Sequence, residues 1–455
     1  MTDNDPMTLT PDHFTGPFTG RTIAGLADDL RRGRATSAEL TESALDAIAA
    51  HNPALNAFVT VDAEGAMAAA RRADEELAGG ADRGPLHGVP VAVKDLIMIA
   101  GLRVTMGSRH FAGHVPEADA GCVALLRESG AVIVGTTTTH EFAYGPTGDR
   151  SAAGPARNPW NPERMTGGSS AGSGAAVAAG LVPLALGTDT GGSVRIPAAL
   201  CGVAGFKPAY GAIPADGVFP LSGTLDHVGV LAGSAEDCLL AYSCLTRPLG
   251  GGAEDLGRVR VAWLDPAGLF PGDPRVVRAV HAAAGPLKEV RLPEGVAATL
   301  RETYTTIQSC ETVAVHADRL AAAPELFDPE VLERLRVAAE VPGWRYVRAM
   351  DARAALADAV GALFDHHDVL ALPTVPIIAP PLGLRETEID GRPVAVRAAL
   401  LAMTSPWNVL GLPALTIPAG TVDGLPVGLQ LVARPGQEPS IFEAARTIRP
   451  AGTRT

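Results

Sequence analysis

The basic residues of this chain single out one lysine. Only three of the 37 basic residues are lysines, namely Lys94, Lys207 and Lys288, so arginine is used wherever a fixed positive charge suffices. Arginine keeps its proton in proteins, whereas burial can lower the pKa of a lysine by several units and let it act as a base. Lys207 is a weaker candidate for such a role than Lys94, and Lys288 lies in a polar turn where we expect it to be solvated.

Lys94 is the best placed of the three lysines. It ends the apolar run 89–93 and stands shortly before the apolar run 96–99. An amine in such surroundings must be ion-paired, exposed at a strand end, or uncharged. Pairing with Asp95 or another acid is the purely structural alternative to a catalytic role.

A second feature is the loop Thr190-Gly191-Gly192-Ser193, which follows a predicted buried strand at 181–186. Two adjacent glycines lack the Cβ atoms that would keep a substrate carbonyl away from the backbone. Consecutive N–H groups can then converge on one oxygen and form an oxyanion hole, in which each donor lowers the barrier by about 3 kcal/mol. The Ser193 hydroxyl would attack the same carbonyl group.

The glycine- and serine-rich stretch 166–197 allows other interpretations. A flexible linker is disfavoured because the stretch runs directly into a predicted helix and strand. Gly168–Gly172 fits G-x-S-x-G, but that nucleophile elbow needs a preceding strand, and the two prolines just before it argue against a central strand there. A phosphate-binding G-x-x-x-x-G-K-S/T sequence is not present. His140-Glu141 lacks the second histidine of a zinc protease, so we expect polar packing or capping for His140.

The bulk composition argues against several classes of partner. The formal net charge of −13 disfavours a nucleic-acid or anionic-membrane surface. The five cysteines lack Cys-x-x-Cys spacing and are expected to be buried, reduced thiols. Residues 1–20 lack the basic and apolar regions of a signal peptide, and the uncharged run 165–188 begins with a polar, glycine-rich segment unsuited to a membrane helix. These features predict a cytoplasmic protein.

Apolar patterns predict an α/β fold. Thr36–Glu39 is typical of a capping box, with Leu40, Ala44, Leu45 and Ile48 at helical spacing behind it, and 66–77 predicts a second helix. Short apolar runs separated by helical or irregular sequence are typical of strands buried on both faces. We expect such strands at 89–93, 131–134, 181–186, 258–264, 369–372, 415–417 and 427–432.

The order of these elements predicts one large domain with a central mixed β-sheet flanked by helices. Residues 1–20 are expected to form a mobile N-terminal arm, and 21–455 the domain. Within the domain we expect a core at about 85–230, a helical substrate-side region at about 270–365 and a sheet-completing segment at about 366–440. The glycine-rich stretch Pro248–Gly257 predicts a hinge or boundary.

Several segments together resemble the amidase signature family. The likeness covers nearly the whole chain, is strongest from 85 to 230, and is weakest from 250 to 365. Its spacings, 75 residues from Lys94 to Ser169 and 24 from Ser169 to Ser193, are also similar to those of the family. The segments that carry the resemblance are Gly88-Val89-Pro90, Val93-Lys94-Asp95, Gly167-Gly168-Ser169-Ser170, Gly187–Ser193, Arg195-Ile196-Pro197, Gly205–Pro208, Leu225–Gly229, Pro373–Pro376 and Leu425–Gln430.

The resemblance implies a Ser–cisSer–Lys triad and the amidase signature fold. Ser193 would attack an amide carbonyl and form an acyl-enzyme that water hydrolyses. Ser169, after a cis peptide from Gly168, would relay the proton to an uncharged Lys94. The N–H groups of residues 190–193 would form the oxyanion hole. Supporting roles are expected for Ser170, Asp189 and Arg195.

The substrate is less well defined by the sequence. We expect a largely apolar pocket from Phe142, Tyr144, Phe219, Leu221 and Trp407, although each of these could equally belong to the core. The family hydrolyses aliphatic, aryl, malonyl, fatty and peptide amides, and nothing in the sequence selects one of them. The resemblance implies a small-molecule amide substrate without metal, organic cofactor, nucleic acid or membrane, and homodimers are common among similar proteins.

Three alternatives stay open. One is the A subunit of the tRNA-dependent amidotransferase, which releases ammonia from glutamine. The segment 139–145 looks more like the stand-alone amidases, and 300–365 lacks the tyrosine- and lysine-rich helices of that subunit. A second is an amide-forming acyltransferase, in which an amine instead of water captures the acyl-enzyme. The third, a non-catalytic binding protein on the same scaffold, is disfavoured because all three triad residues are present.

Overall fold

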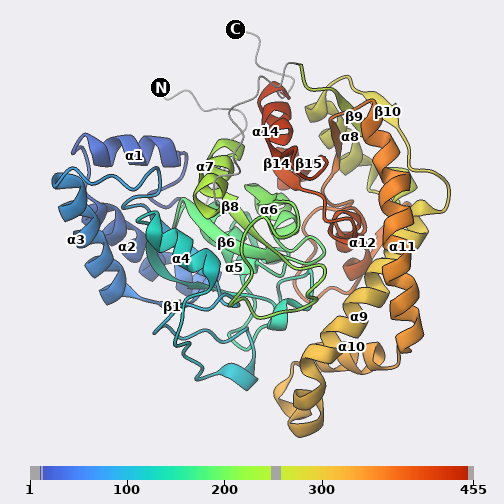
Figure 1. Cartoon of the computed structure of the whole chain (residues 1–455), viewed down its shortest axis with the longest axis horizontal. Coiled ribbons are helices and arrows are strands. Elements are labelled where there is room, and N and C mark those ends of the chain that lie inside the picture. Colours follow the sequence, from blue (N-terminus) through green and yellow to red (C-terminus); the bar gives the residue numbers. More distant parts are fainter. Residues whose placement is uncertain (1–10, 12–13, 247–257, 449–455) are drawn as a thin grey trace.

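The chain folds around one central β-sheet (Figure 1). The computed structural model describes residues 11, 14–246 and 258–448. The strands of the main sheet are β1 (Phe58–Val61), β2 (Pro90–Lys94), β3 (Val132–Thr137), β6 (Leu184–Asp189), β7 (Ala204–Lys207), β8 (His227–Ala232), β9 (Val261–Leu264), β10 (Lys288–Val290), β11 (Val369–Pro373), β14 (Ala414–Val422) and β15 (Leu425–Val432). Two hairpins lie outside it: β4 (Arg157–Asn158) with β5 (Asn161–Met165), and β12 (Glu386–Ile389) with β13 (Arg392–Ala395).

The sheet is mixed. Its order is β1-β3-β2-β6-β8-β7-β14-β15-β11-β9-β10. Strand β2 runs parallel to both β3 and β6, and β9 runs parallel to both β10 and β11. The remaining neighbours are antiparallel. The expected α/β fold with a central mixed sheet is therefore confirmed.

Helices cover both faces of the sheet. They are α1 (Ile23–Arg31), α2 (Ser37–Leu55), α3 (Ala63–Ala78), α4 (Gly121–Glu128), α5 (Ala171–Ala178), α6 (Arg195–Cys201), α7 (Ala235–Leu245), α8 (Pro274–Ala284), α9 (Val296–Ala322), α10 (Pro329–Ala339), α11 (Gly343–Gly361), α12 (Val396–Ala402), α13 (Ser405–Val409) and α14 (Glu438–Thr447). Short 3₁₀ helices are η1 (Arg109–Phe111), η2 (Glu141–Ala143), η3 (Pro266–Gly268), η4 (Pro324–Leu326) and η5 (Ala362–Asp365).

Strand side chains alternate between two hydrophobic layers, as the period of two requires. Val91 and Val93 belong to the hydrophobic layer that also contains side chains of helices α4, α7, α8 and α14. Ala92, between them, packs on the other face with α2 and α5. Further along the sheet, that second face is covered by α9 and α11–α13. Figure 1 shows α1–α3 at one end of the molecule and α9–α11 at the other. Burial on both faces explains why the strands read as short apolar runs.

Most predicted strands lie within a few residues of their expected positions. Two of them begin three residues later than predicted. Strand β6 begins at Leu184 instead of 181, and Pro183, just before it, cannot donate a ladder hydrogen bond. Strand β9 begins at Val261 instead of 258. Strand β6 also continues to Asp189, so the predicted catalytic loop starts directly where the strand ends.

The predicted capping box is confirmed. The Thr36 hydroxyl accepts a hydrogen bond from the N–H of Glu39, and the Glu39 carboxylate accepts one from the N–H of Thr36. Leu40, Ala44 and Ile48 are buried, whereas Leu45 is partly exposed. The predicted helix at 66–77 is α3.

The C-terminal segment contributes strands to the main sheet. Strands β14 and β15 pair with each other, β14 also pairs with β7, and β15 pairs with β11. The region predicted to be helical, about 270–365, contains α8, α9, α10 and α11, with the strand β10 between α8 and α9. Helix α9 packs against α10, α11 and α13, which brings its buried face toward the middle of the molecule.

The N-terminal segment is packed where the structure describes it. The predicted mobile arm, 1–20, is described at residues 11 and 14–20 only. There Gly16 and Phe18 donate backbone hydrogen bonds to the carbonyl groups of Ala179 and Gly180, and the Phe18 ring is buried. The expected mobility therefore does not apply to residues 16–18. The predicted boundary at Pro248–Gly257 lies outside the described residues.

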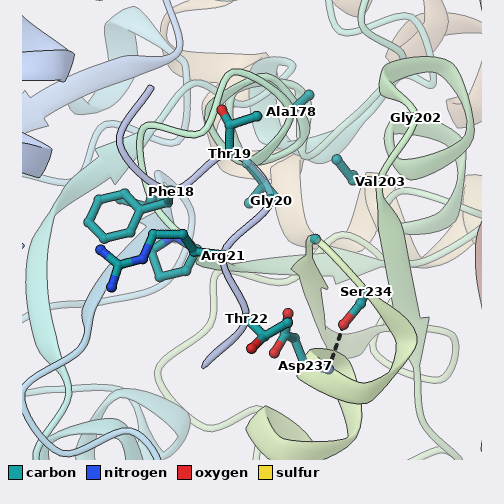
Figure 2. Close-up of a pocket in the computed structure, with 14 residues that line it drawn as sticks. Phe18, Thr19, Gly20, Arg21, Thr22, Ala178, Gly202, Val203, Ser234 and Asp237 are labelled. Atoms are coloured by element: carbon teal, nitrogen blue, oxygen red, sulfur yellow. Dashed lines mark hydrogen bonds between the residues drawn. The ribbon is translucent and has the colours of Figure 1, made fainter. Parts of the chain in front are cut away.

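A hollow of about 60 Å³ lies between the N-terminal segment and α7, and Figure 2 shows the residues that line it. The N–H of Asp237 donates to the Ser234 hydroxyl at 3.1 Å, and the Asp237 carboxylate accepts from the N–H of Ile23 at 2.7 Å. This carboxylate therefore fixes the start of α1. The hollow contains none of the predicted catalytic residues, so it is not the candidate site.

The cysteines are unpaired thiols. Cys122, Cys201 and Cys238 are buried, as expected, whereas Cys244 and Cys310 are partly exposed. Burial raises the pKa of Cys122 to about 12, which makes that thiol a poor nucleophile. Of the helices in the described residues, none combines the length and apolar character that crossing a membrane would require.

Candidate active site

Lys94 lies at the carboxyl end of β2, with its side chain fully buried. Its Nζ atom donates hydrogen bonds of 2.7 Å to Ser169 Oγ and 2.7 Å to Thr188 Oγ1. Among the ion pairs of the described residues, none involves Lys94. The alternative of a Lys94–Asp95 pair is therefore not supported. The Asp95 carboxylate instead accepts hydrogen bonds from the N–H groups of Thr105 and Gly107 and from the Thr105 hydroxyl.

Burial controls the charge of Lys94. Loss of hydration lowers its pKa to about 7, and the charges of Asp189 and Asp226 raise it only in part. A group with this pKa is about half uncharged at neutral pH. The amine can therefore accept a proton under ordinary conditions.

Ser169 is held by backbone contacts on both sides. The peptide bond from Gly168 to Ser169 is cis, as the resemblance implied. The N–H of Gly168 donates to the Pro146 carbonyl at 2.7 Å, and the Ser169 carbonyl accepts from the N–H of His140 at 3.0 Å. These bonds fix the position from which the Ser169 hydroxyl reaches Lys94.

Ser193 is joined to this loop through its backbone. The N–H of Ser170 donates to the Ser193 carbonyl at 3.1 Å. Ser193 is buried, with 5 % exposure, and its hydroxyl makes no hydrogen bond to any described residue. The structure thus brings Lys94 and Ser169 into direct contact and holds Ser193 beside them, without a hydrogen bond between the two serine hydroxyls. Ser170 also bonds the backbone of Thr188, which ties the loop to β6.

The predicted oxyanion loop needs one correction. The N–H of Gly192, expected to donate into the oxyanion hole, instead donates to Asp189 Oδ1 at 2.7 Å. Asp189 turns this amide inward because its buried carboxylate needs several donors. The N–H groups of Thr190, Gly191 and Ser193 donate to no acceptor within the described ranges. These three groups are the ones free to bind a substrate oxygen.

The two glycines of this loop make room for neighbouring side chains. A Cβ atom on Gly191 would collide with the hydroxyl of Tyr304, which comes from α9. A Cβ atom on Gly192 would collide with the hydroxyl of Thr404, and its φ of +134° disfavours any other residue. The Thr404 hydroxyl also donates to the Gly191 carbonyl at 2.6 Å. Distant parts of the chain therefore fix the shape of the loop.

Asp189 and Arg195 form an ion pair at the base of the loop. Both side chains have 0 % exposure. Arg195 Nε donates to Asp189 Oδ2 at 2.9 Å, and Arg195 Nη2 donates to Asp189 Oδ1 at 2.8 Å. Burial alone would raise the pKa of Asp189, but the Arg195 charge and its hydrogen bonds outweigh burial and hold that pKa below its usual range. Arg195 also donates to the Thr404 carbonyl, the Gln430 side chain and the Asn408 side chain.

Two of the five predicted pocket residues line a cavity beside the site. A cavity of about 280 Å³ is lined by Phe219 and Leu221 together with Thr188, which bonds Lys94. Its wall also includes Leu96 and His227. A cavity that adjoins the Lys94 partner is the natural place for one part of a substrate.

The other three predicted pocket residues do not line that cavity. Phe142 packs in an aromatic cluster, with its ring 5.4 Å from that of Phe219. The Tyr144 ring contacts two arginines, Arg334 and Arg397. Trp407 is a core residue whose Nε1 donates to the Met403 carbonyl at 2.9 Å. An apolar side chain fits core and pocket equally well, which is why the sequence did not separate these cases.

Other residues singled out in the sequence contact the backbone or the core of the protein. Lys207 is buried and donates to the Leu412 and Pro208 carbonyl groups at 2.6 and 3.1 Å. His140 is buried at the N-cap of η2, and its ring makes no hydrogen bond within the described part of the chain, so of the two expected roles, packing or capping, its side chain packs and does not cap. The strand before Ser170, β5, belongs to a separate hairpin, in agreement with the argument against a nucleophile elbow.

Sequence reasoning missed several residues that shape the site: Thr188, Tyr304, Gln308, Thr404, Asn408 and Gln430. Thr188 and Gln430 could have been noticed, because they lie within Gly187–Ser193 and Leu425–Gln430, two of the segments that carry the family resemblance. The other residues come from segments more than 100 positions away along the chain from that loop. No local pattern marks them.

Known proteins match this chain along most of its length. The family model described as Amidase matches residues 39–442. The A subunit of glutamyl-tRNA(Gln) amidotransferase from Roseiflexus sp. (strain RS-1) is 36 % identical, over 92 % of this chain and 94 % of that protein. The 1-carboxybiuret hydrolase subunit AtzE from Pseudomonas sp. (strain ADP) is also 36 % identical, over 94 % of this chain and 98 % of that protein.

A solved structure has the same fold. It is described as a vestigial protein complex that reveals the evolutionary origins of an s-triazine catabolic enzyme. Its TM-score is 0.88 at 34 % identity, covering 95 % of this chain and 100 % of that chain. The sheet, the signature segments and the length of the match all agree. This chain therefore belongs to the amidase signature family, whose enzymes hydrolyse amide C–N bonds.

Proposed function

We propose that this enzyme hydrolyses a small carboxamide through a serine acyl-enzyme, with Ser193 as nucleophile, Ser169 as proton relay and Lys94 as base. The observation that carries the proposal is the environment of Lys94. Its amine is fully buried, forms no ion pair with a described carboxylate, and lies 2.7 Å from Ser169 Oγ. An uncharged amine has two N–H bonds and one lone pair. It can donate to Thr188 while it accepts the Ser169 proton.

The proton then moves in two linked transfers. Ser193 Oγ attacks the carbonyl carbon and gives its proton to Ser169 Oγ, while the Ser169 proton passes to Lys94 Nζ. The carbonyl oxygen becomes negative and is bound by the free N–H groups of residues 190, 191 and 193. The C–N bond breaks as the proton returns along the same path to the leaving amine. Water then hydrolyses the acyl-enzyme.

A fluorophosphonate probe tests the nucleophile. Such a probe phosphonylates an activated serine, and peptide mass spectrometry locates the adduct. We expect the adduct on Ser193, and none on the Ser193→Ala variant. Ser43 is partly exposed on α2, and its hydroxyl donates to a backbone carbonyl, so Ser43→Ala is a matched control that should label normally. An adduct on Ser169 or Ser170 would contradict the assignment.

The 36 % sequence identity to an amidotransferase A subunit supports a second candidate function, glutamine hydrolysis as part of a larger assembly. The two candidates differ in what the purified chain does alone. We expect the chain alone to hydrolyse simple amides, with hydroxamate as product when hydroxylamine is added. Glutamine hydrolysis that requires additional subunits, with no turnover of simple amides, would favour the second candidate.

A further inference from the structure

One arginine near the site has an unused hydrogen-bond donor. Arg397, on α12, donates a hydrogen bond from its Nη2 atom to Gln308 Oε1 at 3.2 Å. Its Nε atom is buried and has no hydrogen-bond partner among the described residues. It also takes part in none of the ion pairs found in the described ranges. A buried donor without an acceptor is unfavourable, and native structures rarely keep one without a reason.

Contacts connect Arg397 to both sides of the proposed triad. Gln308, its acceptor, donates to the Tyr304 hydroxyl at 2.6 Å, and that hydroxyl packs against Gly191 in the oxyanion loop. The Arg397 guanidinium also lies 5.9 Å from the ring centre of Tyr144. The next residue, Gly145, packs its carbonyl against Gly168, just before Ser169. The guanidinium is therefore two hydrogen bonds away from the oxyanion loop.

The surroundings of Arg397 carry an excess of positive charge. Arg334 also lies over the Tyr144 ring, at 5.1 Å. Three arginines, Arg150, Arg334 and Arg385, share the Glu330 carboxylate, and Arg385 also pairs with Asp149. These pairs use two carboxylates for three cations and provide none for Arg397. The excess is notable because the whole chain has a formal net charge of −13.

We propose that Arg397 binds a carboxylate of the substrate, so that the preferred substrates are small amides with a carboxylate a few atoms from the scissile carbonyl. This inference rests on the proposed function. A carboxylate suits Arg397 because its oxygens accept from guanidinium N–H groups, and such charge-assisted bonds are stronger than neutral ones. Gln308 and Tyr304 hold the guanidinium at a fixed place relative to the oxyanion loop.

Matched pairs of amides test this proposal. Each pair differs by a carboxylate in place of a methyl group: malonamate with propionamide, succinamate with butyramide, and glutaramate with valeramide. For at least one pair, kcat/KM should favour the carboxylated amide by about tenfold or more. In Arg397→Gln this ratio should fall toward one, and in Arg397→Lys it should be intermediate. Arg392→Gln, an exposed arginine on β13, should keep the wild-type ratio.

Binding without turnover separates this inference from the proposed function. In the Ser193→Ala protein, the additional change Arg397→Gln should weaken calorimetric binding of the preferred carboxylated amide at least about tenfold. The inference would be overturned if neutral and carboxylated amides were hydrolysed equally well, or if the ratio of their kcat/KM values were unchanged in Arg397→Gln. Either result would leave the proposed function standing. No hydrolysis of any amide and no probe on Ser193 would refute the proposed function, while Arg397-dependent binding would still support the carboxylate site.

Discussion

Asp189 and Arg195 form a two-bond ion pair that is completely buried at the base of the proposed oxyanion loop. The Asp189 carboxylate also accepts from the N–H groups of Gly192 and Val194 and from the Asn408 side chain. The Asp189 carboxylate thus forms hydrogen bonds with the oxyanion loop, and Arg195 forms hydrogen bonds with the C-terminal segment. The pair links the two parts of the chain that build the site.

Breaking this pair should destabilise the protein strongly. Arg195→Met leaves a buried carboxylate without its cation, and we expect the free energy of unfolding to fall by about 3–5 kcal/mol. Urea unfolding measures the change. Arg260→Met, which breaks an exposed pair with Asp368, serves as the matched control and should cost less than about 1 kcal/mol. Equal costs for the two variants would contradict a structural role of the Asp189–Arg195 pair.

The rate of hydrolysis should depend on the charge of Lys94. The proposed base works only when it is uncharged, and its pKa is lowered to about 7. As pH falls below 7 the amine becomes protonated, so kcat/KM should decrease about tenfold per pH unit, and it should level off above 7. A pH–rate profile measures this dependence.

Glu141 could produce the same profile, because burial raises its pKa to about 7 as well. Its carboxylate accepts from the Ser108 hydroxyl and from the N–H of Asp328, away from the proposed triad. Glu141→Gln should therefore keep the inflection near pH 7. An inflection that disappears in this variant would assign the titration to Glu141 and not to Lys94.

Substitutions of Lys94 should separate charge from basicity. Lys94→Ala should lower kcat by about 10²- to 10⁴-fold, the usual contribution of a general base. Lys94→Arg should not restore the rate, because a guanidinium does not give up its proton. Steady-state kinetics on one amide measures both variants, with thermal unfolding to check that they fold. Near-normal turnover by Lys94→Arg would exclude Lys94 as the base.

A methyl group on Gly191 should disturb the loop. In Gly191→Ala the new Cβ would collide with the Tyr304 hydroxyl, so we expect a loss of about 1–3 kcal/mol in stability together with a lower kcat. Gly343→Ala is the control, because nothing lies within 4 Å of a Cβ at that position. Thermal unfolding and steady-state kinetics measure the two effects. A Gly191→Ala protein as stable and active as Gly343→Ala would show that Tyr304 does not constrain the loop.

Features encoded by neighbouring residues could be predicted from the sequence. Strands appeared as short apolar runs because they are buried on both faces, and the capping box at Thr36 is a local pattern. Lys94 could be singled out because lysine is rare in this chain, and because the carboxyl end of a buried strand leaves a lysine few options. The proximity of Lys94 to Ser169 followed from the family resemblance and not from any local rule.

Features that depend on distant segments could not be predicted. Tyr304 and Thr404 fill the space left by the two loop glycines, yet only the fold brings them there. The same is true of the Gly192 amide, whose direction is decided by the Asp189 carboxylate. Phe142 and Trp407 are apolar in the same way as Phe219, but whether an apolar side chain faces a cavity depends on packing.

The protonation state of the Lys94 amine can be measured directly. The chain has only three lysines, so protein labelled with ¹³C and ¹⁵N in lysine gives a simple NMR spectrum, and Lys94→Met identifies the Lys94 signal. A pH titration should give Lys94 a pKa of about 7. A Lys94 chemical shift that stays at the value of a protonated amine up to about pH 10, as in an ordinary lysine, would contradict the account.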